Sequence, residues 1–347
     1  MLSAAIEGMF LNSELFDHQR GASTKGYKKI DMGTLVLSTQ NLHLGNANVN
    51  LRFEHGMVSP AYKTYHIHDC SIGLIAEWVK SEKAKRFFYD ATTVGASVCR
   101  RNVEWDTLYD QSLYLPSEAE QERLATFLTA LTTRIKKQTE LVEHLKKYKR
   151  GLHKRVFSSK PHWAVKPLRD IATFCGGGTP SKDVSKYWQG NIGWISSSDV
   201  QEDWIDEISI SRRITEEAIA NSATKLCPKG TIAIISRVGV GKVAIMPEDL
   251  CTSQDYTNIT TIDGDITFFA YQIAHKMKIE ASKTQGTAIK GVTADTIKSM
   301  EMDIPNLDEQ RKIATTLQKF DHRIKHEIQL LNFLQKTKRS LLQQLFM

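Results

Sequence analysis

The chain contains the same stretch of 42 residues twice. Residues 116–157 read PSEAEQERLATFLTALTTRIKKQTELVEHLKKYKRGLHKRVF, and residues 305–346 read PNLDEQRKIATTLQKFDHRIKHEIQLLNFLQKTKRSLLQQLF, without a gap, at an offset of 189 residues. Gln121 matches Gln310, and a Lys-Arg pair occurs at the same place in both copies. Agreement of this density is not expected by chance. The sequence therefore predicts an internal repeat, and the fold must accommodate two copies of one unit.

Each copy has the pattern of a long helix. Pro116 and Pro305 come just before the two patterns, where a missing backbone N–H costs little. Apolar residues then recur at alternating spacings of four and three, over about five heptads. Two separate surface helices would show a wider and less regular apolar stripe. The pattern therefore predicts two coiled-coil helices that pack against each other.

Polar residues interrupt the apolar seam at equivalent places: Gln138 and Lys149 in the first helix, Glu327 and Lys338 in the second. An antiparallel pair with pseudo-two-fold symmetry can place Lys149 against Glu327 and Gln138 against Lys338. A lysine facing leucine would bury a charge unless its long side chain reached solvent. We therefore predict this coiled-coil register, because polar pairs in a seam fix alignment. In the alternative, both lysines reach solvent and the leucines alone set the register.

The repeat extends upstream into segments typical of short strands. GTLVLS at 33–38 resembles GTIAII at 230–235, and SPAY at 59–62 stands where SQDY stands at 253–256. These segments are rich in β-branched residues and are broken by Gly, Asn and Asp. The predicted fold class is α+β: two strand-rich domains joined by an antiparallel coiled coil of two long helices, with a pseudo-two-fold internal repeat.

The two copies are unequal at their starts. ISSSDV at 195–200 resembles LSAAIE at 2–7, so the first copy has no counterpart of residues 163–194. We expect either a longer reading frame upstream or a silent or exchangeable cassette. The predicted parts are a short first domain, the first helix, the second domain and the second helix, at 1–115, 116–160, 161–304 and 305–347.

Composition narrows the class of protein. Hydrophobic residues make up 41% and charged residues 24% of the chain, as in soluble globular proteins. There is neither an apolar run of about 18 residues nor a basic segment typical of a signal peptide, so we expect a cytoplasmic protein. Five cysteines without a CxxC pair predict neither a disulfide framework nor a metal site. The net charge of +7 favours a polyanionic partner.

Taken in order, the repeat, GGGTPS at 176–181, YWQG at 187–190 and IGWISSSDV at 192–200 resemble the specificity subunit of type I restriction–modification systems. The resemblance covers nearly the whole chain, and the order of the motifs is more specific than any one of them. It implies that each globular part is a target-recognition domain that reads one half of a split DNA site. A helix of about 40 residues spans about 60 Å, nearly two turns of B-DNA. We expect the helices to act as a spacer between the two readers.

The resemblance also implies partners. They are double-stranded DNA, two copies of a modification subunit that carries the methyltransferase, and restriction subunits that carry the nuclease and translocase. No membrane partner is implied, and the subunit itself is expected to be non-catalytic, without a cofactor. S-adenosylmethionine, ATP and Mg are expected in the partner subunits. The alternative is a stand-alone DNA-binding protein or a silent remnant of a specificity cassette.

Candidate DNA-binding residues of the second domain lie in polar or glycine-rich turns. Glycines let backbone N–H groups approach a phosphate, and serine, threonine and lysine contact phosphates or base edges. A solvated turn, with Trp188 packed in the core, is the alternative. The candidates are Thr179, Ser181, Lys182, Lys186, Ser197, Ser198, Arg237 and Lys242.

Two further motifs favour structural interpretations. RVGVGK at 237–242 has Ser236 and Val243 where a Walker loop needs Gly and Ser or Thr, so we predict a hairpin turn. VSPAY at 58–62 is similar to the S-P-P-Y tetrapeptide of amino-methyltransferases, but Ala61 replaces the second Pro and no glycine-rich cofactor loop precedes it. A methyltransferase active site is therefore not predicted. The first domain's counterpart of the RVGVGK turn holds its candidate DNA-binding residues, Asn41, His43 and Asn46.

Overall fold

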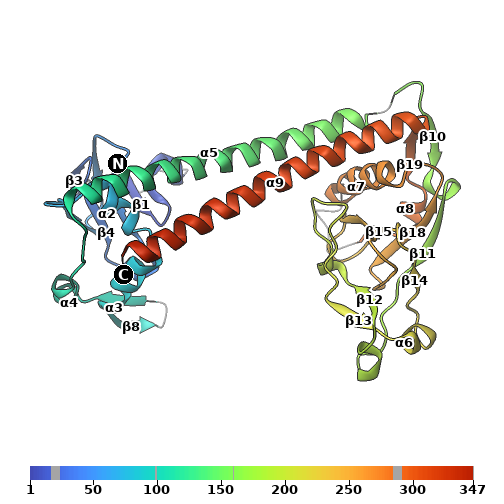
Figure 1. Cartoon of the computed structure of the whole chain (residues 1–347), viewed down its shortest axis with the longest axis horizontal. Coiled ribbons are helices and arrows are strands. Elements are labelled where there is room, and N and C mark those ends of the chain that lie inside the picture. The colour runs from blue at the N-terminus through green and yellow to red at the C-terminus, as the bar shows by residue number, and fades with distance from the viewer. Residues whose placement is uncertain (17–23, 98–99, 159, 284–290, 347) are drawn as a thin grey trace. The chain divides into compact units, whose positions relative to one another are not determined.

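The computed structural model describes residues 1–16, 24–97, 100–158, 160–283 and 291–346, and Figure 1 labels its elements. The chain divides into two compact units. The first comprises Met1–Val142 and Glu327–Met347, and the second comprises Glu143–His326. Helices α5 (Glu118–Val156) and α9 (Leu307–Leu345), each 39 residues long, contribute to both units. None of the described helices is both long and apolar enough to cross a membrane.

The first unit consists of short strands and helices packed on parts of α5 and α9. Its strands form antiparallel sheets in the orders β1–β2, β3–β6, β5–β4–β7 and β8–β9. In chain order the elements are β1 (Leu2–Ala5), β2 (Gly8–Leu11), α1 (Asn12–Leu15), β3 (Lys28–Asp31), β4 (Leu35–Ser38), β5 (Ala47–Val49), β6 (His55–Val58), β7 (Tyr62–Tyr65), α2 (Ile72–Trp78), α3 (Glu82–Asp90), β8 (Thr92–Ser97), β9 (Arg100–Val103) and α4 (Trp105–Asp110).

The core of the first unit joins the strands to both long helices. Leu74 and Trp78 of α2 share one buried cluster with Leu128 of α5 and Leu342 of α9. The 3.5-residue pattern therefore buries part of its apolar stripe against the globular domain as well as between the helices.

The second unit contains two four-stranded sheets. One, in the order β11–β18–β15–β16, is antiparallel; the other, β13–β12–β17–β14, is mixed, because β12 pairs with β17 in parallel. The elements are β10 (Ala164–Pro167), β11 (Ala172–Gly176), β12 (Ile192–Ile195), β13 (Arg212–Ile214), α6 (Glu216–Ala220), β14 (Leu226–Cys227), β15 (Ile232–Ile235), β16 (Val243–Ile245), β17 (Leu250–Thr252), β18 (Tyr256–Ile262), α7 (Ile266–Lys283), α8 (Ala294–Lys298) and β19 (Glu301–Ile304).

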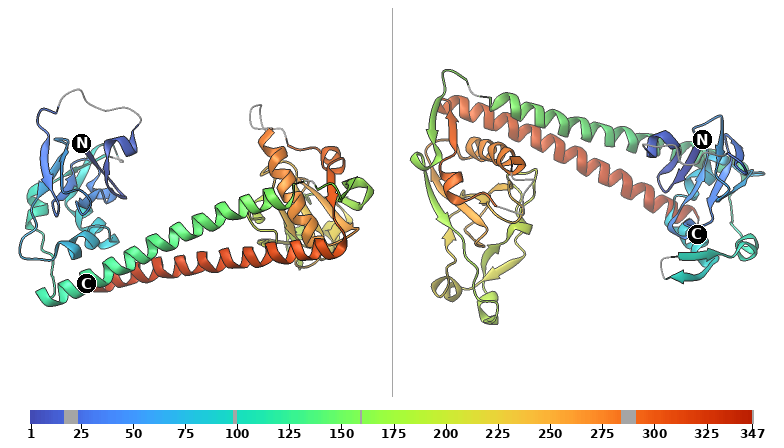
Figure 2. Two further views of the ribbon diagram at one scale, coloured as in Figure 1. Left: turned by 90° about the horizontal axis from the view of Figure 1, so that it is seen from above. Right: turned by 180° about the vertical axis from the view of Figure 1, so that it is seen from behind.

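Helix α7 is the centre of the second unit. It lies between the antiparallel sheet and the unit's parts of α5 and α9 (Figure 2). Phe268 and Tyr271 of α7 are almost completely buried. They belong to one cluster with Ile232 of β15, Phe157, which follows α5, and Leu317 of α9. The helix thus connects the strands to the helix pair through a continuous apolar core.

The strand order shows the repeat directly. The order β5–β4–β7 in the first unit matches β16–β15–β18 in the second, and the pair β3–β6 matches β14–β17. In the second unit, β11 adds a fourth strand beside β18, and β10 pairs with β19. Among the described residues of the first unit, no strand takes either place.

In each unit the two long helices run antiparallel. In the first unit, Gln138 bonds Glu327 at 2.6 Å and Thr132 bonds Lys338 at 2.6 Å, so numbers rise on one helix as they fall on the other. In the second unit, Lys149 pairs with Asp321 at 2.7 Å. The predicted fold class, α+β with strand-rich domains on antiparallel helices, is confirmed.

Candidate nucleic-acid interface

In the second unit, Asp199 holds the serine turn after β12 in one shape. Its buried carboxylate accepts hydrogen bonds from the N–H (2.7 Å) and hydroxyl (2.8 Å) of Ser196 and the hydroxyl of Ser211 (2.9 Å). Arg212 adds an ion pair at 3.2 Å and stacks 4.6 Å from the Trp194 ring centre. Burial by itself would raise the pKa of Asp199, but these donors hold it below its ordinary value. The turn is therefore fixed before any ligand arrives.

Four predicted residues lie at this turn or at the neighbouring β15–β16 turn. Ser198 is exposed, and its hydroxyl lies 2.9 Å from that of Ser196. The Lys242 ammonium donates to the Ser197 carbonyl oxygen at 3.4 Å. Arg237 is exposed at the start of the same β15–β16 turn as Lys242. RVGVGK is a hairpin turn, as predicted, because β15 and β16 pair antiparallel. DNA contact by these residues stays a prediction.

The glycines of GGGTPS serve close backbone packing. A Cβ on Gly177 would lie 2.0 Å from the carbonyl oxygen of Ser253, and one on Gly178 would lie 2.3 Å from the backbone of Ala223. The Gly178 N–H donates to the Thr252 carbonyl oxygen at 2.8 Å. That donor is already used, so the expectation that the loop's N–H groups reach a phosphate does not hold at Gly178.

The two lysines after this loop differ in whether they have an ion-pair partner. Lys186 forms a 2.5 Å ion pair with Glu217, and this hydrogen bond raises the pKa of Lys186. Lys182 is exposed, and no described residue pairs with it. The indole of Trp188 donates to the Ser181 carbonyl oxygen at 3.1 Å and packs edge-on against another tryptophan, and the residue is half-buried. Lys182 is thus the more available phosphate ligand.

A neighbouring cavity of about 820 Å³ contains polar residues that the sequence reasoning missed. Gln254 and Lys298 line it together with Arg237. The Thr179 hydroxyl donates to the Gln254 amide oxygen, which connects Thr179 to this cavity. Glutamine and arginine are the side chains that read adenine and guanine edges. The SQDY match marked the turn that holds Gln254, whereas no sequence signal marked Lys298.

In the first unit, the β4–β5 turn is the counterpart of the β15–β16 turn, as predicted. Asn41 is exposed there. The Nδ1 atom of His43 is buried without a partner among the described residues, and burial, followed by the charge of Arg101, lowers the pKa of His43. Asn46 is buried, donates to the Ala4 carbonyl oxygen at 3.2 Å and accepts from Asn48. In this conformation, the Asn46 amide joins β5 to β1 and is not presented to a base.

The predicted register of the helices is wrong. Gln138 Nε2 donates to the carboxylate of Glu327 at 2.6 Å and to its backbone carbonyl at 3.1 Å, and these residues are equivalent positions 189 residues apart. The predicted pairs were Lys149 with Glu327 and Gln138 with Lys338. That prediction paired each lysine with another polar residue of the coiled-coil seam.

Both lysines instead meet acids that the seam pattern does not contain. Lys149 pairs with Asp321 at 2.7 Å, and Lys338 pairs with Glu77 of α2 at 2.5 Å. The Tyr271 hydroxyl also donates to Asp321 at 2.9 Å. Burial raises the pKa of Asp321, although the bonds from Lys149 and Tyr271 oppose this. The globular domains therefore supply or support the counter-charges of the seam.

Comparison with known proteins identifies the family. The family model described as type I restriction modification DNA specificity domain matches residues 161–336, half of the chain. The chain belongs to this family. The match contains every candidate of the second unit, whereas Asn41, His43 and Asn46 lie outside it.

Two family members align over part of their length. The MjaIX specificity subunit of Methanocaldococcus jannaschii is 36% identical over 171 residues, which are 48% of this chain and 39% of that protein. The EcoR124I/EcoR124II specificity subunit of Escherichia coli is 29% identical over 220 residues, 61% of this chain and 53% of that protein. The matches thus span about two fifths and about half of the lengths of these relatives.

Solved structures share the fold over most of the chain. The type I restriction–modification S subunit of M. genitalium superposes with a TM-score of 0.61 at 14% identity, covering 94% of this chain and 87% of that one. A chain of another type I system gives 0.62 at 15% identity, with 94% and 84% covered. The HsdS subunit of Thermoanaerobacter tengcongensis gives 0.51 at 15% identity, with 94% and 83% covered. At these identities the likeness establishes the specificity-subunit fold.

Proposed function

We propose that this chain is the DNA-specificity subunit of a type I restriction–modification enzyme. It recognises a bipartite DNA site and directs methylation and cleavage by partner subunits. The observation that carries the proposal is the repeat. Two units with the same strand order each present a turn between equivalent strands, β4–β5 in one and β15–β16 in the other. Two copies of one reader suit a DNA site made of two halves.

The polar turns of the second unit support a role in reading DNA. Asp199 fixes the serine turn, so Ser197 and Ser198 need little reordering on binding. Arg237 and Gln254 border one cavity and have the side chains suited to purine edges. Lys182 and Lys242 are suited to phosphates. We assign base reading to the serine turn and this cavity, and positioning to the lysines.

The subunit acts with partners and has no catalysis or cofactor of its own. The partners are double-stranded DNA, two modification subunits that bind S-adenosylmethionine, and restriction subunits that use ATP and Mg. The family membership and the specificity subunits among its relatives support this arrangement. The basic net charge of +7 favours a polyanionic ligand.

The test is to express the chain with its modification subunit in a host that lacks DNA methylation, and to map methylated adenines by single-molecule sequencing. We expect one motif with two half-sites separated by unread bases. Arg237→Ala and Ser198→Ala should each relax one half-site and leave the other unchanged. An undivided motif, or methylation by the purified chain alone, would contradict the proposal.

A further inference from the structure

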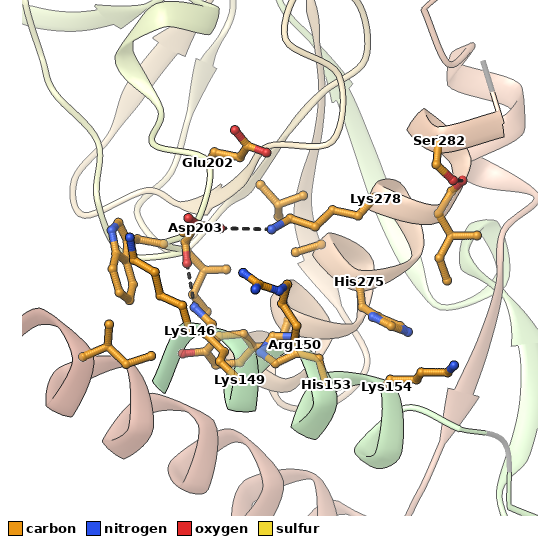
Figure 3. A pocket seen from close by; sticks show the side chains of 17 residues that line it. Lys146, Lys149, Arg150, His153, Lys154, Glu202, Asp203, His275, Lys278 and Ser282 are labelled. Carbon is orange, nitrogen blue, oxygen red and sulfur yellow. Dashed lines mark hydrogen bonds and ion pairs between the residues drawn. The ribbon is translucent and has the colours of Figure 1, made fainter. Parts of the chain in front are cut away.

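The second unit contains a cavity of about 440 Å³ outside the polar turns described above (Figure 3). The end of α5, one face of α7 and the loop 202–205 form its walls. Its apolar part consists of Ile205, Val243, Ala274, Ile279 and Ile324. Ile279 is 44% exposed, so part of this apolar surface is open to solvent. A volume of this size is within the range of small-molecule sites.

Cationic side chains surround this apolar surface. Lys146, Lys149, Arg150, Lys154 and Lys278 line the cavity, against two acids, Glu202 and Asp203. Lys278 pairs with Asp203 at 3.2 Å, and Lys149 donates to the Asp203 carbonyl oxygen at 2.7 Å. No described residue forms a hydrogen bond or ion pair with the guanidinium of Arg150. Figure 3 shows Arg150 extending from α5 toward Lys278. The guanidinium is thus free to bind an anion inside the cavity.

The first unit has a smaller cavity at the equivalent place, of about 290 Å³. Lys338 and Arg339 line it at the positions equivalent to Lys149 and Arg150. Ile135 lies at the position equivalent to Ile324. A cavity here therefore follows from the packing of the helix pair. The chemistry differs, because Gln335, Leu342 and Gln343 replace Lys146, His153 and Lys154. Five cationic side chains therefore line the cavity of the second unit, whereas three line that of the first: Lys80, Lys338 and Arg339.

We propose that the cavity of the second unit binds a small organic anion with an apolar body. The apolar body would pack on Ala274 and Ile279, which keep exposed surface. A carboxylate or phosphate would lie against Arg150, whose planar fork of N–H donors matches two oxygens of either group. Lys278 of α7 would be the second cation at the anionic group.

Two histidines line the wall of this cavity. Burial, together with the smaller effects of the neighbouring Lys149, His275 and Lys278, lowers the pKa of His153 to about 3. Burial and the charges of Lys276 and Lys278 lower the pKa of His275 as well. Both rings are therefore neutral at pH 7 and add no cation that repels the lysines. An anion in the cavity would offset the charge of these lysines.

The probe for the test is 8-anilinonaphthalene-1-sulfonate, an apolar anion whose fluorescence rises on binding, titrated into the full chain. We expect Arg150→Gln to weaken the cavity-dependent binding about tenfold, as expected for the loss of a charge-assisted hydrogen bond. The matched control is Arg339→Gln at the equivalent place of the first unit, which should leave this binding unchanged. Ile279→Asp, a change at an exposed position, should abolish it by placing a carboxylate beside the apolar surface. Circular dichroism would confirm that each variant is folded.

Displacement identifies the source of the anion. Displacement by octanoate indicates a carboxylate ligand, and displacement by adenosine 5′-monophosphate indicates a phosphate ligand; either supports the proposal. If Arg150→Gln and Arg339→Gln have equal effects, or neither has any, the proposal is wrong. It is also wrong if only a DNA duplex displaces the probe and Arg150→Gln weakens DNA binding to the same degree, because the cavity would then be part of the DNA surface. The outcome does not depend on whether the chain directs methylation.

Discussion

Lys149 in the second unit and Lys338 in the first occupy equivalent positions of the repeat, but their counter-charges come from different elements. Lys149 pairs with Asp321 on α9, and the Tyr271 hydroxyl of α7 supports that carboxylate. Lys338 pairs with Glu77 on α2, and Thr132 of α5 bonds both of them. Thr132 and Asp321 are themselves equivalent, 189 residues apart. The acid and the hydroxyl have exchanged places between the two units.

Glu77 and Tyr271 are also equivalent. The Ser71 N–H donates to the amide oxygen of Gln121 at 2.8 Å. In the second unit, the Asp265 N–H donates to the amide oxygen of Gln310 at the same distance, 2.8 Å. Glu77 and Tyr271 each lie six residues beyond these anchored positions.

The exchange shows what the packing requires at this place. Each site needs one carboxylate next to a partly buried ammonium group and one hydroxyl to complete the hydrogen bonds. It does not require the carboxylate to come from a particular element, because both elements reach the lysine. Two copies of one unit can therefore diverge in sequence and keep the same electrostatics.

The largest expected effect comes from neutralising one acid. Asp321→Asn and Glu77→Gln each leave a lysine that is 13% or 18% exposed without its counter-charge. We expect each to lower the free energy of unfolding by about 3 kcal/mol, measured by urea denaturation at pH 7. Thr132→Asp should restore most of the stability of Glu77→Gln, because it moves the acid to the place it has in the second unit. A double variant no more stable than Glu77→Gln would break the comparison.

The next effect concerns His153, whose equivalent in the first unit is Leu342. The pKa of His153 is about 3 in the folded chain and about 6.5 when unfolded. Protons therefore bind the unfolded state more strongly, and stability is lost as pH falls below about 6.5. At pH 4.5 this loss is about 2–3 kcal/mol. His153→Leu should remove it, as measured by urea denaturation between pH 7 and 4.5.

Leu342→His is the matched variant in the first unit and should introduce the same acid sensitivity. If His153→Leu and the wild type lose stability in parallel as pH falls, the His153 environment is not the cause.

A third prediction concerns the seam pair itself. Gln138→Glu places two carboxylates against each other at a buried position, because Glu327 is 4% exposed. We expect the free energy of unfolding to fall by about 2 kcal/mol at pH 7, and the effect to diminish as the pH is lowered. Thermal denaturation at several pH values measures it. Exchanging the two side chains, with Glu327→Gln added, should restore the wild-type stability. A single variant as stable as the exchanged pair would show that the seam tolerates like charges here.

The smallest effect concerns the two lysines that follow GGGTPS in the second unit, Lys182 and Lys186. Lys182→Gln should reduce the slope of log affinity against log salt by about one, because one phosphate contact is lost. Lys186→Gln should change the slope less, since Glu217 already neutralises Lys186. Fluorescence anisotropy of a labelled duplex at several salt concentrations measures both slopes. Equal changes in slope would show that the Lys186–Glu217 ion pair breaks when DNA binds.

Much of the architecture followed from local patterns. The repeat, the long helices and the β15–β16 hairpin turn were predicted because helix periodicity, proline and glycine act within a few residues. The candidate site was predicted less well. The serine turn was recognised as polar, but Asp199 was not recognised as the group that fixes it. The glycines of GGGTPS were expected to let backbone N–H groups approach a phosphate, whereas the Gly178 N–H donates to a strand of the same unit.

By itself, the sequence determined that this chain is a duplicated unit of strands and a long helix, because repetition and a 3.5-residue period are properties of the chain alone. Only the tertiary structure decided the helix register, the acids that neutralise Lys149 and Lys338, and the internal role of Asn46. These depend on residues distant in sequence, such as Glu77 and Lys338, which meet only when the globular domain packs on the helices. The energy of a buried charge depends on all its neighbours, and a pattern along one helix contains only some of them.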